Sequence, residues 1–369
     1  MRLTLVISSM STGGAERTMA YLANAWAAKD WPVTLMTLDA TPSFYALDPR
    51  INFRPLGMTG NSPNLLAAVK NNLRRVGTLR SAIRAARPAA VISFMDTTNV
   101  LTILAVQGLG LPVIVAEFVH PAQHPIGRCW DRLRRLLYAR ATRLIVQTER
   151  NLEYYPRSIK RIARVIPNPV MVPKEAQGSV LGHAAGKSKV LIAMGRLVEQ
   201  KGFDLLLHAF SRIASKHPAW NLNIWGEGAK RSELEALIAK LGLEQRARLC
   251  GVTRQPFERM RESDLFVLSS RFEGLPNVLC EAMACGLPVI SFDCPTGPRE
   301  MINDGLDGIL VRDGDVHELA AAMDRLMGDE LARKRLSQQA VQVAERFSVE
   351  KIAKMWEQEL AEPLQPGKP

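Results

Sequence analysis

Short apolar runs alternate along the chain with segments whose apolar residues recur at helical spacing. In the first half, buried strands are predicted at residues 3–8, 33–38, 90–94, 113–117 and 144–148, and helices at residues 16–28 and 73–86. In the second half, strands are predicted at residues 190–194, 222–225, 247–249, 265–268 and 289–291. Strands that alternate with helices are typical of a parallel sheet with crossover helices, so the same α/β plan is predicted twice.

Residues 167–189 separate the two halves and are rich in proline, glycine and lysine. We therefore predict a first domain over residues 1–168, a linker over 169–189 and a second domain over 190–345. Residues 346–369 are predicted to form a C-terminal helix that crosses back to the first domain, followed by a tail. Open α/β sheets bind ligands beyond the carboxyl ends of their strands, so two such domains facing each other would form a cleft.

The composition is that of a soluble globular protein, with 47% apolar and 23% charged residues. None of the five cysteines forms a C-x-x-C pair, which indicates reduced thiols in a cytosolic compartment and no zinc site. The N-terminal apolar run has about six residues, too few for a signal peptide. Polar residues, glycines and a proline interrupt the most apolar window, residues 100–119, so no transmembrane segment is expected.

The net charge of +12 is concentrated in the first half of the chain. Residues 1–170 hold 22 Lys and Arg against 9 Asp and Glu, whereas the remaining residues hold 26 against 27. This asymmetry predicts an anionic partner for the first domain only, either a membrane surface, a phosphorylated substrate or nucleic acid. Aromatic residues make up only 6% and form no array for base stacking, which disfavours nucleic acid.

Two loops that follow predicted strands are candidates for anion binding. In STGGAER, residues 11–17, Gly13 and Gly14 allow close backbone approach before a helix begins, although a plain strand-to-helix turn explains the stretch equally well. The stretch lacks the G-x-G-x-x-G pattern of dinucleotide-binding folds. In GRLVEQKGFD, residues 195–204, Arg196 and Lys201 suit a diphosphate; the alternative is two solvated surface cations.

The stretch SRFEGLPNVLCEAMACG, residues 270–286, carries two glutamates eight positions apart, Glu273 and Glu281. Pro276 suits the first turn of a helix and Gly286 its end, which predicts a helix over residues 276–285. The loop before it can turn both carboxylates and the N–H groups of Gly274 and Leu275 toward a ligand. Taken alone, the glutamates are better explained as solvent-facing residues of a helix.

In this order and spacing, the three pieces resemble the retaining glycosyltransferases of family 4, which have the GT-B fold of two Rossmann-like domains facing a cleft. The glutamates match the E-x7-E motif of that family, GRLVEQKGFD its phosphate-binding loop and GGAER its N-terminal glycine loop. The resemblance covers roughly residues 1–350 and extends to bacterial enzymes that add N-acetylhexosamine to undecaprenyl-diphosphate-linked glycans.

The resemblance implies roles for individual residues toward a nucleotide-diphosphate sugar. Arg196 and Lys201 would bind the diphosphate, with Gly13 and Gly14 approaching it from the first domain. Glu281 would bind the ribose, and Glu273 would lie near the donor sugar without acting as a nucleophile. The remaining donor contacts implied by these motifs are Gly251 and Val252 at the base, and Gly274, Leu275 and Asn277 in the glutamate stretch.

We expect no cofactor and no metal. The only apparent D-x-D pattern, Asp313-Gly-Asp315, lies in a turn before a helix, where Asp315 is better explained as an N-cap. On the acceptor side the match is looser. We predict His120, rather than His124, as a residue that handles the acceptor, and Asp96 and Asn99 in SFMDTTN as contacts to acceptor hydroxyls.

Two basic segments of the first half are candidates for membrane contact. Over residues 129–144, apolar residues that include Trp130 share one predicted helical face, and Arg132, Arg134 and Arg135 occupy the rest. Residues 70–87 form a second basic helix with six Lys or Arg and no acid. An ordinary core-facing helix with arginines in solvent is the alternative for the first.

Together these features predict a metal-independent retaining glycosyltransferase at the cytoplasmic face of the plasma membrane. It would transfer an N-acetylhexosamine or a hexose from a UDP-sugar to a polyprenyl-diphosphate-linked glycan. A GDP-sugar donor or a soluble acceptor is the alternative within the same fold. A catalytically silent subunit that binds nucleotide sugars is the alternative from another class.

Overall fold

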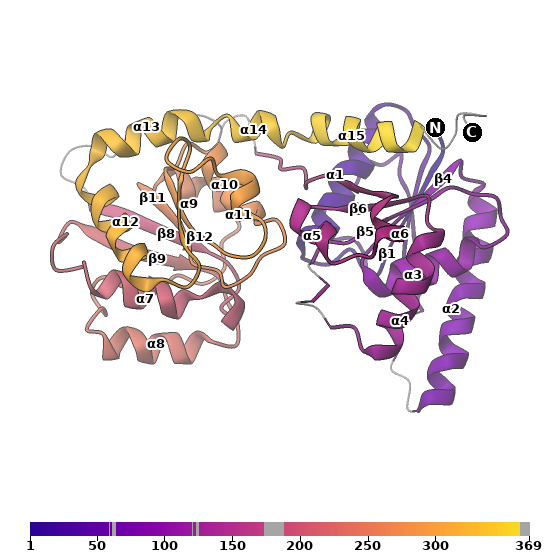
Figure 1. Ribbon diagram of the computed structural model, residues 1–369, viewed down its shortest axis with the longest axis horizontal. Coiled ribbons are helices and arrows are strands. Elements are labelled where there is room, and N and C mark those ends of the chain that lie inside the picture. Colours follow the sequence, from indigo (N-terminus) through magenta and orange to yellow (C-terminus); the bar gives the residue numbers. More distant parts are fainter. Residues whose placement is uncertain (59, 61–63, 120, 123–124, 173–187, 362–369) are drawn as a thin grey trace. The chain divides into compact units, whose positions relative to one another are not determined.

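The computed structural model describes residues 1–58, 60, 64–119, 121–122, 125–172 and 188–361 (Figure 1). Their contacts group the chain into two units, Met1–Pro169 with Ser348–Pro369 (unit 1) and Val170–Phe347 (unit 2). The ends at Pro169 and Phe347 lie within two residues of the predicted domain ends, 168 and 345. Most of the predicted linker, residues 173–187, lies outside the described residues.

Unit 1 contains a seven-stranded parallel sheet in the order β3-β2-β1-β4-β5-β6-β7. Its central strands β1, β2, β4 and β5 are buried along their whole length, which explains their continuous apolar runs. The strand bounds are β1 Leu3–Ile7, β2 Val33–Thr37, β3 Asn52–Pro55, β4 Ala90–Phe94, β5 Val113–Ala116, β6 Arg143–Val146 and β7 Ala163–Val165.

Helices cover both faces of this sheet. One core joins the sheet to α1 (Gly14–Ala28) and to α15 (Val349–Ala361), and the Arg143–Glu359 ion pair at 2.7 Å also holds α15. The core on the other face contains residues of α2 (Leu65–Ala86), α3 (Asp96–Val106) and α4 (Arg128–Leu137). The shorter helices of this unit are η1 Tyr138–Arg140, α5 Glu149–Glu153 and α6 Arg157–Lys160.

Unit 2 repeats the plan with a six-stranded parallel sheet in the order β10-β9-β8-β11-β12-β13. In both sheets the order reverses beside the first strand of the unit, between β1 and β4 and between β8 and β11. The strand bounds are β8 Lys189–Met194, β9 Trp220–Trp225, β10 Ala247–Leu249, β11 Leu265–Leu268, β12 Val289–Asp293 and β13 Ile309–Arg312.

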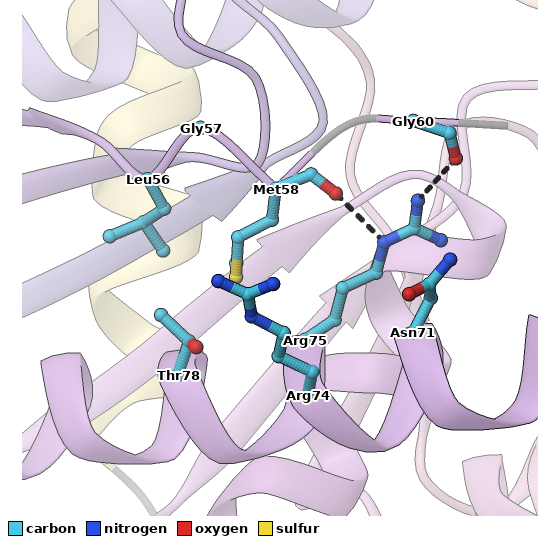
Figure 2. A pocket seen from close by; sticks show the side chains of 8 residues that line it. All are labelled: Leu56, Gly57, Met58, Gly60, Asn71, Arg74, Arg75 and Thr78. Atoms are coloured by element: carbon cyan, nitrogen blue, oxygen red, sulfur yellow. Dashed lines mark hydrogen bonds between the residues drawn. The ribbon is translucent and has the colours of Figure 1, made fainter. Parts of the chain in front are cut away.

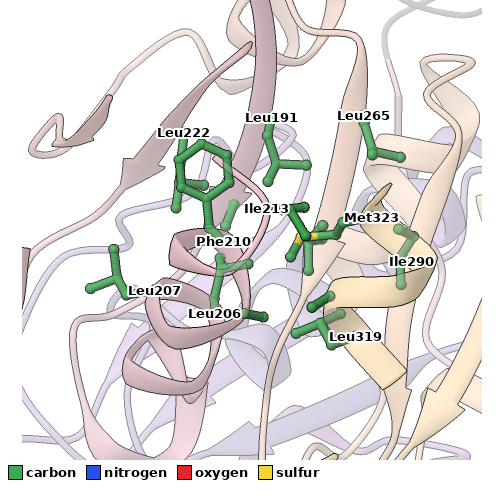
Figure 3. Packing of buried hydrophobic residues seen from close by; sticks show 14 of the residues in the cluster. Leu191, Leu206, Leu207, Phe210, Ile213, Leu222, Leu265, Ile290, Leu319 and Met323 are labelled. Atoms are coloured by element: carbon green, nitrogen blue, oxygen red, sulfur yellow. The ribbon is translucent and has the colours of Figure 1, made fainter. Parts of the chain in front are cut away.

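Two cores also fix the helices of unit 2 on its sheet. Figure 3 shows one of them, where Leu206 and Phe210 of α7 lie near strand residues such as Leu191. The other core packs α10 against the opposite face. The helix bounds are η3 Glu199–Lys201, α7 Phe203–Ser211, α8 Arg231–Lys240, α9 Pro256–Arg261, α10 Asn277–Ala284, α11 Pro298–Met301, α12 Val316–Gly328, α13 Glu330–Ala340 and α14 Val343–Arg346.

The predicted α/β class with parallel sheets is confirmed, as are all ten predicted strands to within a few residues. The sequence did not predict β3, β7 and β13, and all three are edge strands. β3 is exposed or partly exposed along its whole length and lacks an apolar run, whereas β7 and β13 are only 3 and 4 residues long; β10, also an edge strand, was predicted. The predicted N-cap is confirmed, because the Asp315 side chain accepts hydrogen bonds from the first turn of α12.

The prediction for residues 129–144 was wrong in two respects. The helix ends at Leu137, and Leu144 lies in strand β6 rather than on the same helical face. Arg134, expected at a basic surface, is buried with 2% exposure. Arg132 and Arg135 are exposed, but Arg135 pairs with Asp131 at 3.0 Å, and Trp130 packs partly against the core. This helix therefore presents less free positive charge than its sequence indicated.

Arg134 is buried among polar partners of unit 1, of which Glu117 is buried and Asp131 and Tyr154 are partly exposed. Its guanidinium lies 3.9 Å from the carboxylate of Glu117 and donates to Asp131 and to the Tyr154 hydroxyl. The Tyr138 hydroxyl donates a hydrogen bond to Glu117 and accepts one from Asn99. Burial raises the pKa of Glu117 to about 8, against the hydrogen bond from Tyr138. Glu117 is thus protonated in the folded protein at neutral pH.

No described helix combines the length and the apolar composition that a bilayer crossing requires.

Replacing Glu117 by Gln should alter how stability depends on pH. In the unfolded chain this carboxyl titrates near its ordinary value of 4.5, so between pH 4.5 and about 8 the folded state holds a proton that the unfolded state has lost. Its contribution to stability is therefore full below pH 4.5 and is lost as the pH rises toward 8. Between pH 5.5 and 7.5 the loss is roughly 2–3 kcal/mol, since one pKa unit corresponds to about 1.4 kcal/mol.

Urea unfolding at these two pH values measures the effect. Glu117→Gln keeps an acceptor for Tyr138 but cannot ionise, so its stability relative to the wild type should rise with pH. The exposed Glu153→Gln is the control and should follow the wild type. A Glu117→Gln protein with the same pH slope as the wild type would contradict the buried, protonated state.

Candidate active site

Two loops of unit 2 begin at the carboxyl ends of neighbouring strands. The loop after β8 carries Arg196 and Lys201, and the loop after β11 carries Glu273. Because β8 and β11 pair at the point where the strand order reverses, the two loops leave the sheet side by side. This is the position at which open α/β sheets bind ligands.

The two loops meet in an ion pair between Lys201 and Glu273. The Lys201 Nζ lies 2.6 Å from Glu273 Oε1, and the Ser270 hydroxyl donates to the same oxygen at 2.6 Å. Glu273 is 6% exposed, so the pair is largely out of water. Removing charges from water offsets much of their attraction, which makes such a pair weak evidence for stability and favours a positioning role.

The backbone around Glu273 is held from two sides. Gly202 ends the first loop with φ +60, and a Cβ there would lie 2.1 Å from the carbonyl oxygen of Ser269. Gly297, with φ +101, lies in the loop after β12, and a Cβ there would lie 2.5 Å from the carbonyl oxygen of Gly274. Only glycine allows both approaches, so the Glu273 loop is fixed between its two neighbours.

The other predicted donor residues of unit 2 follow the carboxyl ends of its strands β8, β10 and β11. Glu281 is buried within α10, and Asn277 is the first residue of that helix. Leu275 is buried, Gly274 is partly buried, and Arg196 is exposed. At the ends of β9 and β10, the Gly226 N–H donates to the carbonyl oxygen of Gly251 at 2.8 Å. Val252 beside it is 74% exposed.

The glycine loop of unit 1 is tied to a tyrosine. The Gly13 N–H donates to the Tyr45 hydroxyl at 3.1 Å, and that hydroxyl donates to the Gly13 carbonyl oxygen at 2.9 Å. Gly14 is the first residue of α1 and is exposed. The Glu16 carboxylate lies close to Gly13, as shown by the 2.2 Å that would separate a Cβ on Gly13 from Oε2 of Glu16. An anion approaching Gly13 from that side would meet this carboxylate.

The predicted acceptor residues are placed differently from one another. Asn99 is fully buried, and its amide donates to the carbonyl oxygen of Ala116 and to the Tyr138 hydroxyl. These contacts give Asn99 a role inside unit 1 rather than the predicted contact with a ligand. Asp96 is 8% exposed and opens α3 after Met95, whose φ of +76 is strained for a residue with a side chain. His120 and His124 lie outside the described residues.

Sequence reasoning missed two features of unit 1. The buried cluster around Glu117 was signalled only by a charged residue at the end of an apolar strand. The second is a pocket of about 240 Å³ beside α2, between Met58 and Thr78. Figure 2 shows the Arg74 side chain in this pocket, while Arg75 donates to the carbonyl oxygens of Met58 and Gly60.

Within the described ranges, no group of three or more His, Cys, Asp or Glu side chains is placed to hold a metal ion. The loop after β8 carries two cations, Arg196 and Lys201, that an anionic ligand can meet. Lys201 acts as a point charge whose position Glu273 sets. The arrangement suits a ligand with a phosphate group and hydroxyl groups.

Comparisons with known proteins agree with this geometry. The model of the glycosyl transferase 4-like domain matches residues 13–169, and that of the glycosyl transferases group 1 matches residues 182–343. In Streptomyces coelicolor, an exopolysaccharide phosphotransferase is 36% identical over 58% of this chain, but the match spans only 23% of that protein.

A Campylobacter jejuni protein matches almost end to end, with 28% identity over 98% of this chain and 99% of its own. Its name is GalNAc-alpha-(1->4)-GalNAc-alpha-(1->3)-diNAcBac-PP-undecaprenol alpha-1,4-N-acetyl-D-galactosaminyltransferase. Among solved structures, Anabaena HepE in complex with UDP has a TM-score of 0.77 at 18% identity and covers 98% of this chain and 100% of its own. The chain therefore belongs to the glycosyltransferases whose two halves these family models describe, and its fold is GT-B.

Proposed function

We propose that this glycosyltransferase moves an N-acetylhexosamine or a hexose from a UDP-sugar to a polyprenyl-diphosphate-linked glycan, with retention at the anomeric carbon. The observation that carries the proposal is the buried Lys201–Glu273 pair beyond β8 and β11. The Campylobacter relative, named for an undecaprenyl-linked acceptor and an α-1,4 linkage, supports the acceptor class and the retention. The UDP complex of a protein with this fold supports the nucleotide.

In the proposed reaction, the main demand on the protein is to stabilise a leaving diphosphate. The bond between the anomeric carbon and the diphosphate oxygen breaks, and the acceptor hydroxyl forms the new bond on the same face. The hydroxyl proton passes to the departing diphosphate. Fixed cations stabilise the charge that develops there, which is the role we assign to Lys201 and Arg196. We propose that these cations make a metal unnecessary.

Glu273 is proposed to bind donor hydroxyls rather than to attack the sugar. Its Oε1 already accepts hydrogen bonds from both Lys201 and Ser270, and these lower its nucleophilicity. Both contacts leave Oε2 as the oxygen that a sugar hydroxyl would meet. Glu281, buried in α10, is proposed to bind the ribose hydroxyls. The acceptor would meet unit 1, where the excess positive charge of the chain lies.

Membrane attachment is proposed to use α2 rather than α4. The side chains of Leu66, Val69 and Leu73 are 83%, 52% and 68% exposed, and their spacing of three and four residues places them on one face. We call these three residues the apolar stripe. Lys70 and Arg74 flank it and are exposed. An apolar stripe flanked by cations is typical of helices that lie on anionic membranes, and it supports a peripheral location at the cytoplasmic face.

Replacing Lys201 by Ala should lower kcat/KM for sugar transfer about 10²–10³-fold, the usual cost of removing one group that stabilises a developing anion. Glu273→Gln should also lower it, because the amide no longer pairs with Lys201. Transfer is measured from UDP-sugars, with GDP-sugars in parallel, to an undecaprenyl-diphosphate-linked glycan. Nucleotide binding is followed by the rise in melting temperature with UDP or GDP.

The matched control is Lys240→Ala, which removes an exposed lysine at the end of α8. It should transfer sugar like the wild type. Full activity in both Lys201→Ala and Glu273→Gln would refute the site. A wild-type protein that binds UDP but transfers no sugar would indicate the silent subunit instead, and stabilisation by GDP alone would indicate a GDP-sugar donor.

Changing the apolar stripe to serine, as Leu66→Ser, Val69→Ser and Leu73→Ser together, should weaken binding to vesicles that contain phosphatidylglycerol. Burying one leucine side chain contributes about 1.5–3 kcal/mol, so partial insertion of three residues predicts a loss of at least about tenfold. Cosedimentation with vesicles measures it. Leu331→Ser, at a site in α13 that is 72% exposed, should bind like the wild type. Equal binding by the triple variant would exclude α2 as the attachment surface.

A further inference from the structure

Arg271, in the loop after β11, contacts both the loop after β8 and the first turn of α7, and no donor role was assigned to it. Its guanidinium forms two parallel hydrogen bonds to the Asp204 carboxylate, at 2.8 and 2.7 Å. It also donates to the carbonyl oxygen of Glu199 at 2.8 Å and lies 3.4 Å from the Glu199 carboxylate. Paired hydrogen bonds of this kind fix the orientation of both groups.

These contacts join the segment that carries Lys201 to the segment that carries Glu273. Besides its side chain, Arg271 uses its backbone N–H to donate to the carbonyl oxygen of Gln200 at 2.8 Å. The Gln200 amide donates to the carbonyl oxygen of Phe272 at 3.0 Å. The Ser269 hydroxyl donates to the carbonyl oxygen of Lys201 at 3.0 Å. In the chain, Arg271 lies directly between Ser270 and Phe272, so a shift of Arg271 also moves the residues that hold Glu273.

The charges of the pair stabilise each other. The hydrogen bonds to Asp204 raise the pKa of the Arg271 guanidinium. Burial raises the pKa of the Asp204 carboxyl, but the hydrogen bonds and the positive charge of Arg271 lower it overall. Asp204 also lies in the first turn of α7, where the helix dipole favours a negative charge. Both oxygens of Asp204 thus bind the Arg271 guanidinium, whereas Lys201 contacts a single oxygen of Glu273 and Arg196 is exposed, so these two are the cations that we assign to the diphosphate.

We propose that Arg271 and Asp204 are positioning residues that hold Lys201 in register with Glu273 for the donor diphosphate. The inference rests on the proposed donor site. The two side chains are 30% and 39% exposed, so the pair itself contributes little to the stability of the fold. Its effect on the position of Lys201 can be large, because a displacement of about 1 Å at a catalytic group can cost about a hundredfold in rate.

The test compares UDP affinity with stability in the full chain. Arg271→Gln and Asp204→Asn should each weaken UDP binding at least about fivefold by calorimetry, through displacement of Lys201. The melting temperature without ligand should stay within about 2 °C, as expected for a partly exposed pair. Arg259→Gln is the control, because Arg259 pairs with Glu262 at 2.6 Å and is 31% exposed. It should bind UDP like the wild type.

A double-mutant cycle shows whether Arg271 acts through Lys201. If it does, adding Arg271→Gln to Lys201→Ala should weaken UDP binding no further. Unchanged UDP affinity in Arg271→Gln and Asp204→Asn would overturn the inference, as would losses that add fully to that of Lys201→Ala. If Lys201→Ala alone keeps wild-type UDP affinity, the proposed donor site fails and the inference fails with it. If Arg271→Gln and Asp204→Asn keep wild-type UDP affinity while Lys201→Ala loses it, the donor site stands and this inference alone is refuted.

Discussion

The ion pair between Lys201 and Glu273 is the interaction on which the proposed donor site depends. A lysine on a flexible side chain cannot by itself offer a diphosphate a fixed charge, and a buried carboxylate without a partner would be costly. Lys201 compensates the charge of the buried carboxylate, and Glu273 holds the lysine side chain in place. Ser270 fixes the carboxylate, and the close approach of Gly202 to Ser269 fixes the loop, so a mobile cation becomes a positioned one.

The parallel sheets place these residues where they can act. Both sheets reverse their strand order beside the first strand of the unit. In each unit, two loops therefore leave neighbouring strands side by side, and no single crossover helix connects these two strands. In unit 2 these loops carry the cations and the glutamate. In unit 1 they carry Gly13 and the turn at Asp96. Unit 1 also differs in charge, and part of its expected surface charge is absent because Arg134 is buried beside the protonated Glu117 and forms an ion pair with Asp131.

Features that depend on interactions between nearby residues could be predicted from the sequence, and features that depend on contacts between distant residues could not. The central strands, the edge strand β10 and the helix before Gly286 depend on local patterns and were predicted; β3, β7 and β13, which are short edge strands, were missed. The motifs identified Lys201 and Glu273, but their ion pair joins residues far apart in the chain and needed the structure. The burial of Arg134 beside Glu117 involves distant parts of the chain, and the contact of Arg271 with Asp204 joins the loop after β11 to α7. Helical periodicity indicates neither Glu117 as a neighbour of Arg134 nor Asp204 as a partner of Arg271.

A crystal structure of the protein with UDP tests the central claim most directly. The account predicts that the diphosphate lies within hydrogen-bond distance of Lys201 Nζ, and that Ser270 still donates to Glu273. It also predicts the ribose beside Glu281 in α10. UDP bound elsewhere on the chain, with Lys201 and Glu273 paired as they are now and in contact with no ligand atom, would contradict the account.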